Sequence, residues 1–170
     1  MKLNIGCGPR YQEGYVNIDA CNEFRTDVVL RLPNEKLVDR FGVCVADELI
    51  ADDVLEHFFR WEGIEVLEDF RGVLKQGGIL TIKTPCLAAI IKSGIPIQRK
   101  MELIRGYQGQ PMVKPGGVLG HAWESHTELF AHKYTWDEVE LKTVLVQMCF
   151  GFKSLSWNDS NSMTLCAIKA

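Results

Sequence analysis

The chain has 170 residues, of which 46% are hydrophobic and 24% are charged. This length and apolar content suffice for one buried core, so we expect residues 1–170 to form a single domain. The 19 basic and 22 acidic side chains give a net charge of -3, and this balance gives no signal for a nucleic-acid or anionic-membrane partner.

The six cysteines stand singly, without a Cys-x-x-Cys pair, and no secretory leader precedes the first apolar segment. No apolar run reaches the roughly 20 residues that a membrane-spanning helix needs. These features predict a cytoplasmic protein with no membrane contact, whose thiols are reduced and packed in the core.

Short apolar runs alternate with helical patterns over the first half of the chain. Asn34 is a candidate cap for a short helix that runs through Phe41, and a second helical pattern covers 53–74. This second pattern is long enough to break into two helices near Gly63. The glycine pair at 77–78 is a typical signal for the end of a helix. The first two predicted strands are close in the sequence. Either the crossover helix between them is reduced to a turn or two, or the two strands are connected unusually. Strands are predicted at 3–5, 15–19, 27–30, 48–51 and 79–84.

The second half begins with two helical pieces between 87 and 107 and ends in two strands. Between them, 106–132 is rich in glycine and proline, and we expect it to be an active-site loop or lid. A capping box at 135–138 predicts a helix that Gly151 ends. Strands at 152–157 and 163–170 then form a hairpin. The order predicts an α/β sandwich with a mostly parallel sheet and an antiparallel edge.

Four sequence blocks in this order resemble a known family. They read LNIGCGP at 3–9, VNID at 16–19, DVLEHF at 53–58 and RGVLKQGGIL at 71–80. The chain is similar to class I S-adenosylmethionine (SAM)-dependent methyltransferases, and most similar to a small branch of predicted methyltransferases. The resemblance implies a Rossmann-like sandwich with a seven-stranded sheet and a C-terminal antiparallel hairpin. It also implies SAM as the cofactor and S-adenosylhomocysteine as its product.

The resemblance also implies where the cofactor is held. The backbone from Gly6 to Gly8 would lie along the amino-acid part of SAM, while Asp19 would accept hydrogen bonds from both ribose hydroxyls. A turn aspartate is the alternative role for Asp19. The chain departs from the family pattern at Asn4, where many members carry an acid, and it lacks a third glycine. The expected cofactor-binding residues are Gly6, Cys7, Gly8, Asp19, Ala20, Leu32, Asp52 and Asp53.

His57 and Asp53 are the candidate catalytic residues. His57 can act as a general base because imidazole titrates near neutral pH, although methyl transfer depends mainly on alignment and a structural histidine is the alternative. Asp53, Glu56 and His57 stand at i, i+3 and i+4, which would place them on one face of the predicted helix. This spacing also resembles a metal-binding set in some relatives. Because the Leu-Glu-His triplet is widespread in relatives without metal, we expect no bound metal. A metal shell, as the alternative, would be completed by His121, His126 or His132.

The class of the methyl acceptor can be inferred only by elimination. The sequence has no basic groove and no Asn/Asp-Pro-Pro-Tyr-like box, which leaves an oxygen or nitrogen atom of a small-molecule or sugar-like acceptor. Aromatic residues before the last helix can line an acceptor pocket, but core packing is their more frequent role. The residues concerned are Trp123, Tyr134 and Trp136.

Two other functions stay open. A methyltransferase fold that has lost catalysis would bind the cofactor or a partner subunit only. An NAD-type oxidoreductase needs a third glycine and an acid about 20 residues later, whereas Asp19 follows Gly8 by 11 positions. The sequence therefore favours the methyltransferase over the oxidoreductase.

Overall fold

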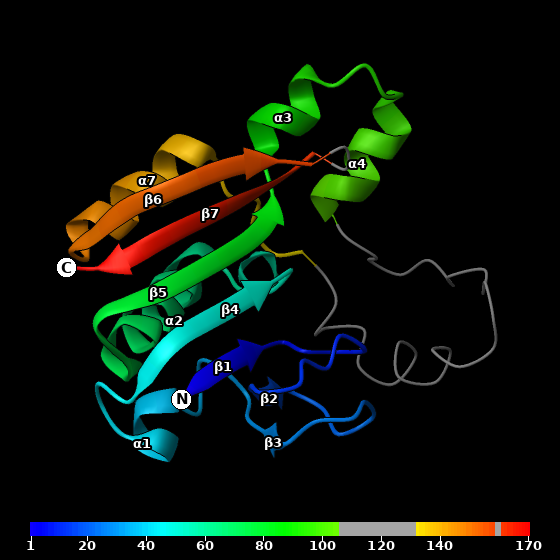
Figure 1. Ribbon diagram of the computed structural model, residues 1–170. Coiled ribbons are helices and arrows are strands. Elements are labelled where there is room, and N and C mark those ends of the chain that lie inside the picture. Colours follow the sequence, from blue (N-terminus) through cyan, green and yellow to red (C-terminus); the bar gives the residue numbers. More distant parts are fainter. Residues whose placement is uncertain (106–131, 159–160) are drawn as a thin grey trace.

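The computed structural model describes residues 1–105, 132–158 and 161–170, which form a twisted sheet with helices packed on it (Figure 1). The strands are β1 Lys2–Ile5, β2 Val16–Asp19, β3 Val28–Val29, β4 Ala46–Asp52, β5 Leu74–Pro85, β6 Phe150–Trp157 and β7 Ser162–Lys169. The helices are α1 Leu37–Phe41, α2 Arg60–Val73, α3 Leu87–Lys92, α4 Ile97–Arg105 and α7 Glu138–Gln147, with a 3-10 helix, η1, at Leu55–His57.

The sheet has the order β3-β2-β1-β4-β5-β7-β6. Neighbours among β1 to β5 pair in parallel, and β7 runs antiparallel between β5 and β6. This confirms the predicted mostly parallel seven-stranded sheet with a closing antiparallel hairpin. The strand order reverses between β1 and β4. In sheets of this kind, ligands bind in the crevice beyond the carboxyl ends of the strands at such a reversal.

The connections from β1 to β2 and from β2 to β3 contain no helix. The buried side chain of Asn17 organises the first connection instead. Its amide nitrogen donates to the carbonyl oxygens of Gln12 and Tyr15 at 3.0 Å, and its oxygen accepts from Gln12 N at 2.8 Å and from Asn4 Nδ2 at 2.9 Å. A single amide thus satisfies backbone groups of the loop, which explains how a parallel pair is joined without the usual crossover helix.

The core lies between the sheet and the helices on one of its sides. In Figure 1, α2 and α7 stand on the same side of the sheet, and α3 and α4 lie beyond the end of β5. Alternate strand residues are buried against these helices because successive side chains point to opposite faces. The core contains Leu3, Leu49, Leu80 and Leu165 from the strands and Leu67, Phe70 and Leu141 from the helices. None of the described helices is long and apolar enough to cross a membrane.

The predicted helix over 53–74 is wrong in its start and in its break, whereas its end agrees with the end of α2 at Val73. Asp53 lies outside any helix with a φ of 57°. The chain then forms η1 and turns extended at Phe58 and Phe59 before α2 begins, so the break falls ahead of Gly63. The backbone N–H of Phe59 donates to Glu62 Oε2 at 2.9 Å, which fixes the start of α2 there.

The predicted stop signals at Gly77 and Gly151 are also wrong. Helix α2 ends at Val73, and the glycine pair at 77–78 lies inside β5. Gly151 lies inside β6, and α7 ends before it. Asp137, rather than Thr135, caps α7, because its carboxylate accepts from Val139 N at 2.9 Å. The glycine and hydroxyl residues in the sequence therefore indicated roughly where these helices begin and end, but not the exact terminal residues.

Several sequence predictions fall outside the described residues. They include all of the expected loop or lid except His132, together with His121, Trp123 and His126. The expectation that residues 1–170 form one domain stays a prediction.

Candidate functional site

The glycine turn after β1 adopts the conformation for which glycine is suited. Gly6 and Gly8 have positive φ values of 61° and 47°. A Cβ at Gly6 would lie 2.5 Å from Cγ2 of Val54, whereas a Cβ at Gly8 would meet no atom of the described residues within 4 Å. The N–H of Cys7 donates to the carbonyl of Ile18 at 3.1 Å, which ties the turn to β2. The turn is thus closely packed on one side and open at Gly8.

Asn4, the departure from the family pattern, holds this turn in place. It is 3% exposed, and its Nδ2 donates to the carbonyl of Arg10 at 3.0 Å and to Oδ1 of Asn17 at 2.9 Å. Its amide therefore braces the loop that follows the glycine turn against β2. Sequence reasoning missed this role because the partners of Asn4 lie on the next loop and the next strand.

Asp19 ends β2 beside the glycine turn. Its Oδ2 accepts from the N–H of Gly8 at 2.8 Å, and its Oδ1 accepts from the N–H of Cys21 at 3.1 Å. Each carboxylate oxygen can accept more than one hydrogen bond, so both still have the capacity to accept from a diol. The carbonyl of neighbouring Ala20 accepts from Arg31 Nε at 3.2 Å, and Leu32 is partly buried against the core.

Asp52 ends β4 and Asp53 follows it, on the other side of the strand-order reversal from the glycine turn. Arg10 Nη1 lies 3.1 Å from a carboxylate oxygen of each, and Arg10 Nη2 donates to the carbonyl of Asp52 at 2.9 Å. Lys83 Nζ lies 2.8 Å from Asp52 and 3.7 Å from Asp53. Arg10 thus joins the glycine turn to the end of β4 across the strand-order reversal. Arg10 and Lys83 carry no signal in the sequence for this role, because their partners are distant along the chain.

Glu56 is a buried acid directly beyond this pair of aspartates. It is 0% exposed, its Oε2 accepts from Thr84 Oγ1 at 3.0 Å, and its Oε1 has no hydrogen-bond partner among the described residues. Burial, and then the nearby charge of Asp53, raises the pKa of Glu56 to about 8. The acid is therefore mostly protonated at neutral pH when no cation lies beside it.

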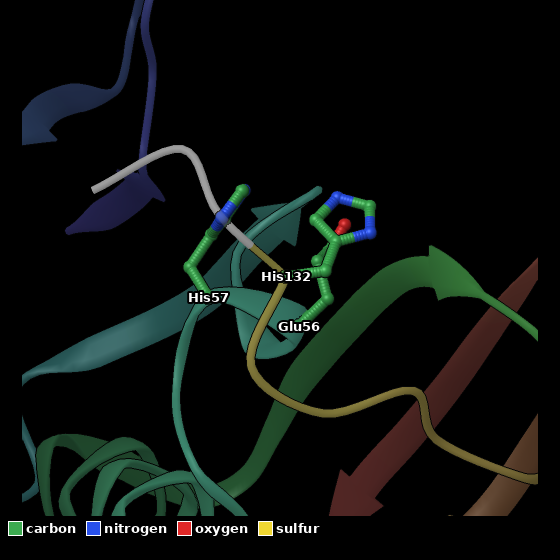
Figure 2. Close-up of side chains that lie close together, drawn as sticks. All are labelled: Glu56, His57 and His132. Carbon is green, nitrogen blue, oxygen red and sulfur yellow. The ribbon is translucent and has the colours of Figure 1, made fainter. Parts of the chain in front are cut away.

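His57 and His132 lie beside Glu56 although they are far apart in the sequence. Figure 2 shows the three side chains gathered where η1 meets the extended chain before α7. The two imidazole rings meet edge to face, with centroids 5.1 Å apart and planes at 70°. The N–H groups of Lys133 and Tyr134 donate to the carbonyl of Glu56 at 2.8 and 3.2 Å, which holds the two segments together.

Asp53, the other candidate catalytic residue, does not join this group. Its carboxylate faces Arg10 and Lys83, as described above. The helix face proposed for Asp53, Glu56 and His57 does not exist, because Asp53 precedes η1 with positive φ. The structure brings His132 to Glu56 and His57 instead.

Of the described aromatic residues of the expected acceptor pocket, Trp136 is buried and Tyr134 is partly buried. Trp136 is 0% exposed, and its Nε1 donates to the carbonyl of Leu55 at 3.4 Å. Tyr134 packs edge to face on Trp136, and its hydroxyl donates to Glu140 Oε2 at 2.7 Å. Trp136 is therefore a core residue, which confirms the more frequent role expected for these aromatics.

The cysteines are all free thiols. Burial raises the pKa values of Cys7 and Cys21, so these thiols stay protonated and unreactive near neutral pH. Cys44 and Cys149 are exposed, so the prediction that all the thiols are packed in the core is wrong for these two. Both have positive φ, which places them in turns at the surface.

Solved structures of methyltransferases share this fold. A SAM-dependent methyltransferase from Mesorhizobium loti matches 98% of this chain and 89% of its own, with a TM-score of 0.62 and 12% identity. One from Archaeoglobus fulgidus matches 99% and 85%, with a TM-score of 0.61 and 14% identity. The 1,6-didemethyltoxoflavin-N1-methyltransferase of Burkholderia thailandensis, with bound 1,6-didemethyltoxoflavin and S-adenosylhomocysteine, matches 99% and 70%, with a TM-score of 0.61 and 13% identity. Neither a protein-family model nor a curated protein matches the sequence. The chain therefore has the Rossmann-like fold of these methyltransferases.

Proposed function

We propose that the protein is a SAM-dependent methyltransferase that transfers the methyl group to an oxygen or nitrogen atom of a small-molecule or sugar-like acceptor. The observation that carries the proposal is the pairing of Gly8 and Asp19 at the strand-order reversal. An open glycine turn and a carboxylate at neighbouring strand ends are the two groups needed to hold an adenosyl ligand by its amino-acid part and its ribose. The fold shared with SAM-dependent methyltransferases supports the same conclusion.

The cofactor contacts follow from this placement. Backbone groups of Gly6, Cys7 and Gly8 lie along the amino-acid part, and Asp19 accepts from the ribose hydroxyls. The adenine lies between the loops that end β3 and β4, against the last four residues of the predicted set: Ala20, Leu32, Asp52 and Asp53. Arg10 adds a cation beside the glycine turn, where the carboxylate of the cofactor would be attracted.

The reaction is an in-line displacement at the methyl carbon, so its rate depends first on how donor and acceptor are aligned. His57 is the last residue of η1, the short helix that follows β4, and in this proposal it accepts the acceptor's proton. Asp53 contributes through its ion pair with Arg10, which fixes the edge of the crevice. Both roles are proposals that substitution can test.

The competing reading is a methyltransferase fold without catalysis. The helix-free connection between β1 and β2 favours it, because the crevice then lacks the element that usually follows the glycine turn. This reading predicts cofactor binding with no turnover, or binding only beside a partner chain. Cofactor binding and turnover must therefore be measured separately.

The test is calorimetric titration of the purified protein with S-adenosylhomocysteine. We expect micromolar affinity in the parent protein and a loss of at least about tenfold in Asp19→Ala, since one hydrogen bond to a charged group contributes roughly 1.5–3 kcal/mol. Asp39→Ala, which removes an exposed acid of α1, is the matched control and should bind as the parent does. A folded parent protein that does not bind, or an Asp19→Ala variant that binds equally well, would contradict the proposal.

Turnover is assayed with SAM and a panel of hydroxyl and amine acceptors, by following S-adenosylhomocysteine release. Binding with turnover supports the enzyme. Binding without turnover across the panel supports the catalytically degenerate alternative. The NAD-type reading predicts that a nicotinamide dinucleotide binds at least as tightly as S-adenosylhomocysteine.

A further inference from the structure

The cluster of Glu56, His57 and His132 has the composition and the geometry of a metal-binding group. One ligand atom from each residue lies within 4.8 Å of the others. Glu56 is buried, and the two histidines are partly exposed, so the group lies at the boundary between core and solvent. A cation can therefore approach from the imidazole side and reach the carboxylate behind it.

A second observation points to a ligand at this place. Glu56 Oε1 is buried and has no hydrogen-bond partner among the described residues, although Thr84 satisfies Oε2. A buried acceptor without a partner is unfavourable, and such an atom calls for an ion or another unseen partner. A cation held by Oε1 and the two imidazoles would satisfy that oxygen and neutralise the buried charge.

We propose that Glu56, His57 and His132 bind one divalent transition-metal ion. The donor set decides the class of metal. Two imidazoles with one carboxylate suit ions such as Zn²⁺, Co²⁺ and Fe²⁺, whereas Mg²⁺ and Ca²⁺ prefer sites built from oxygen ligands alone. Three protein ligands also leave coordination positions open for water or for a donor atom of a substrate.

The surrounding structure holds the three ligands in place. The N–H groups of Lys133 and Tyr134 both donate to the carbonyl of Glu56, which fixes the chain beside His132 against η1. Thr84 Oγ1 donates to Oε2 and orients the carboxylate. Hydrogen-bond partners of this kind fix the orientation of metal ligands and contribute to metal affinity.

The spacing of the ligands requires only a small contraction. Bonds of roughly 2.0–2.2 Å to an ion place its ligand atoms up to about 4 Å apart. The separations within 4.8 Å therefore close through side-chain rotations on binding. Asp53 is not a ligand, because Arg10 and Lys83 face its carboxylate.

The position connects the ion to the crevice without making its binding depend on the cofactor. Glu56 follows β4, which ends at Asp52, and Asp53 lies between them, so the cluster is near these two candidate cofactor residues in the chain. When the ion is bound, His57 serves as its ligand and not as a free base. The inference does not rest on the proposed function, because metal binding is measured in the absence of SAM and of any acceptor.

The test is a titration of the metal-free protein with Co²⁺, followed by visible absorption, with Zn²⁺ binding measured by calorimetry. We expect one equivalent per chain. Glu56→Gln keeps the size of the side chain, and we expect it to lower the affinity at least about tenfold, as we expect for His132→Ala. Thr84→Val, which removes only the orienting hydroxyl, should lower it about tenfold or more. Excess Mg²⁺ should not compete.

The exposed thiols provide the controls. Cys44→Ser and Cys149→Ser remove the soft donors at the surface and should leave Co²⁺ binding unchanged. Each variant is checked by its melting temperature, and His132→Gln replaces His132→Ala if the latter does not fold. Absence of binding in the folded parent protein would overturn the proposal. So would binding that survives both Glu56→Gln and a His132 variant, or binding that is lost with the cysteines. S-adenosylhomocysteine affinity of Glu56→Gln, measured in parallel, separates a failure at this site from a failure of the proposed function.

Discussion

The N–H of Gly8 donates to Oδ2 of Asp19 at 2.8 Å, so the glycine turn after β1 and the acid at the end of β2 are joined before any ligand arrives. The open side of Gly8 and the remaining acceptor capacity of Asp19 therefore belong to one preformed surface. A preformed site binds with less loss of conformational freedom than one that must order its loops.

Gly8→Ala tests whether that open space is the cofactor's. A non-glycine residue at positive φ is strained by about 1–2 kcal/mol, and no described atom lies within 4 Å of the added Cβ. We expect only this modest loss in the free energy of unfolding, but a loss of S-adenosylhomocysteine affinity of at least about tenfold. Denaturant unfolding and calorimetry measure the two effects.

Gly14→Ala is the matched control. Gly14 also has positive φ, and no atom in the described part of the chain lies within 4 Å of its added Cβ. It precedes β2, however, and so lies at the amino ends of the strands, opposite the glycine turn. It should show the same strain and unchanged affinity. Equal losses of affinity in the two variants would mean that strain, and not occupied space, weakens binding.

Arg10→Gln tests the cation beside the turn. The Arg10 ion pairs are half-exposed, so their loss should lower the free energy of unfolding by less than about 1 kcal/mol. We expect S-adenosylhomocysteine to bind about five- to tenfold more weakly, with a smaller dependence on salt. Methylthioadenosine, which lacks the amino-acid part, is the control ligand. If the affinities for both ligands fall equally, Arg10 acts on the whole site and not on the carboxylate of the cofactor.

The order of strands and helices could be predicted because each element has its own local pattern. The apolar runs that end at Ile5, Asp19 and Ala51 identified three of the parallel strands and their carboxyl ends, where the candidate site residues lie. Their sequence blocks also placed Gly8 and Asp19 together before the geometry was known, and the structure joins them by a hydrogen bond.

What could not be predicted depends on contacts between distant segments. His132 reaches Glu56 because backbone groups of the following residues donate to the Glu56 carbonyl, and no periodicity records such a bond. Asp53 leaves the helical pattern because its N–H donates to the carbonyl of Lys83 on the neighbouring strand. Local spacing alone therefore placed Asp53 on a helix face. It also could not identify His132 as the residue that joins Glu56 and His57.

The acid at position 56 predicts a pH dependence of stability in the metal-free protein. Its pKa rises from 4.5 to about 8 on folding, through burial and the nearby charge of Asp53. The folded state therefore holds this proton more tightly, and the contribution to stability is full below about pH 4.5 and falls as the pH rises towards 8. The slope is at most about 1.4 kcal/mol per pH unit.

Denaturant unfolding at pH values from 5 to about 8.5, with a chelator present, checks this. The control is Glu56→Gln, which cannot ionise and should lack this part of the slope. The groups around the acid are Asp52 and Asp53, His57 and His132, so the difference between the two proteins is the relevant quantity. If the free energy of unfolding changes with pH in the same way in the parent protein and in Glu56→Gln, then Glu56 keeps its ordinary pKa in the folded protein.

Gly63→Ala tests whether Trp136 is a fixed core residue. Alanine favours a helix over glycine by about 1 kcal/mol, but the added Cβ would lie 2.9 Å from Cζ2 of Trp136, which is 0% exposed. Because the ring is also held by its hydrogen bond to Leu55, it has little room to move. We expect a net loss of about 1–3 kcal/mol in the free energy of unfolding. In a Trp136→Phe background the clashing atom is gone, so the same substitution should become neutral or stabilising. A loss of equal size in both backgrounds would show that another contact opposes the alanine, and it would reopen the role of Trp136 as a mobile residue near the acceptor.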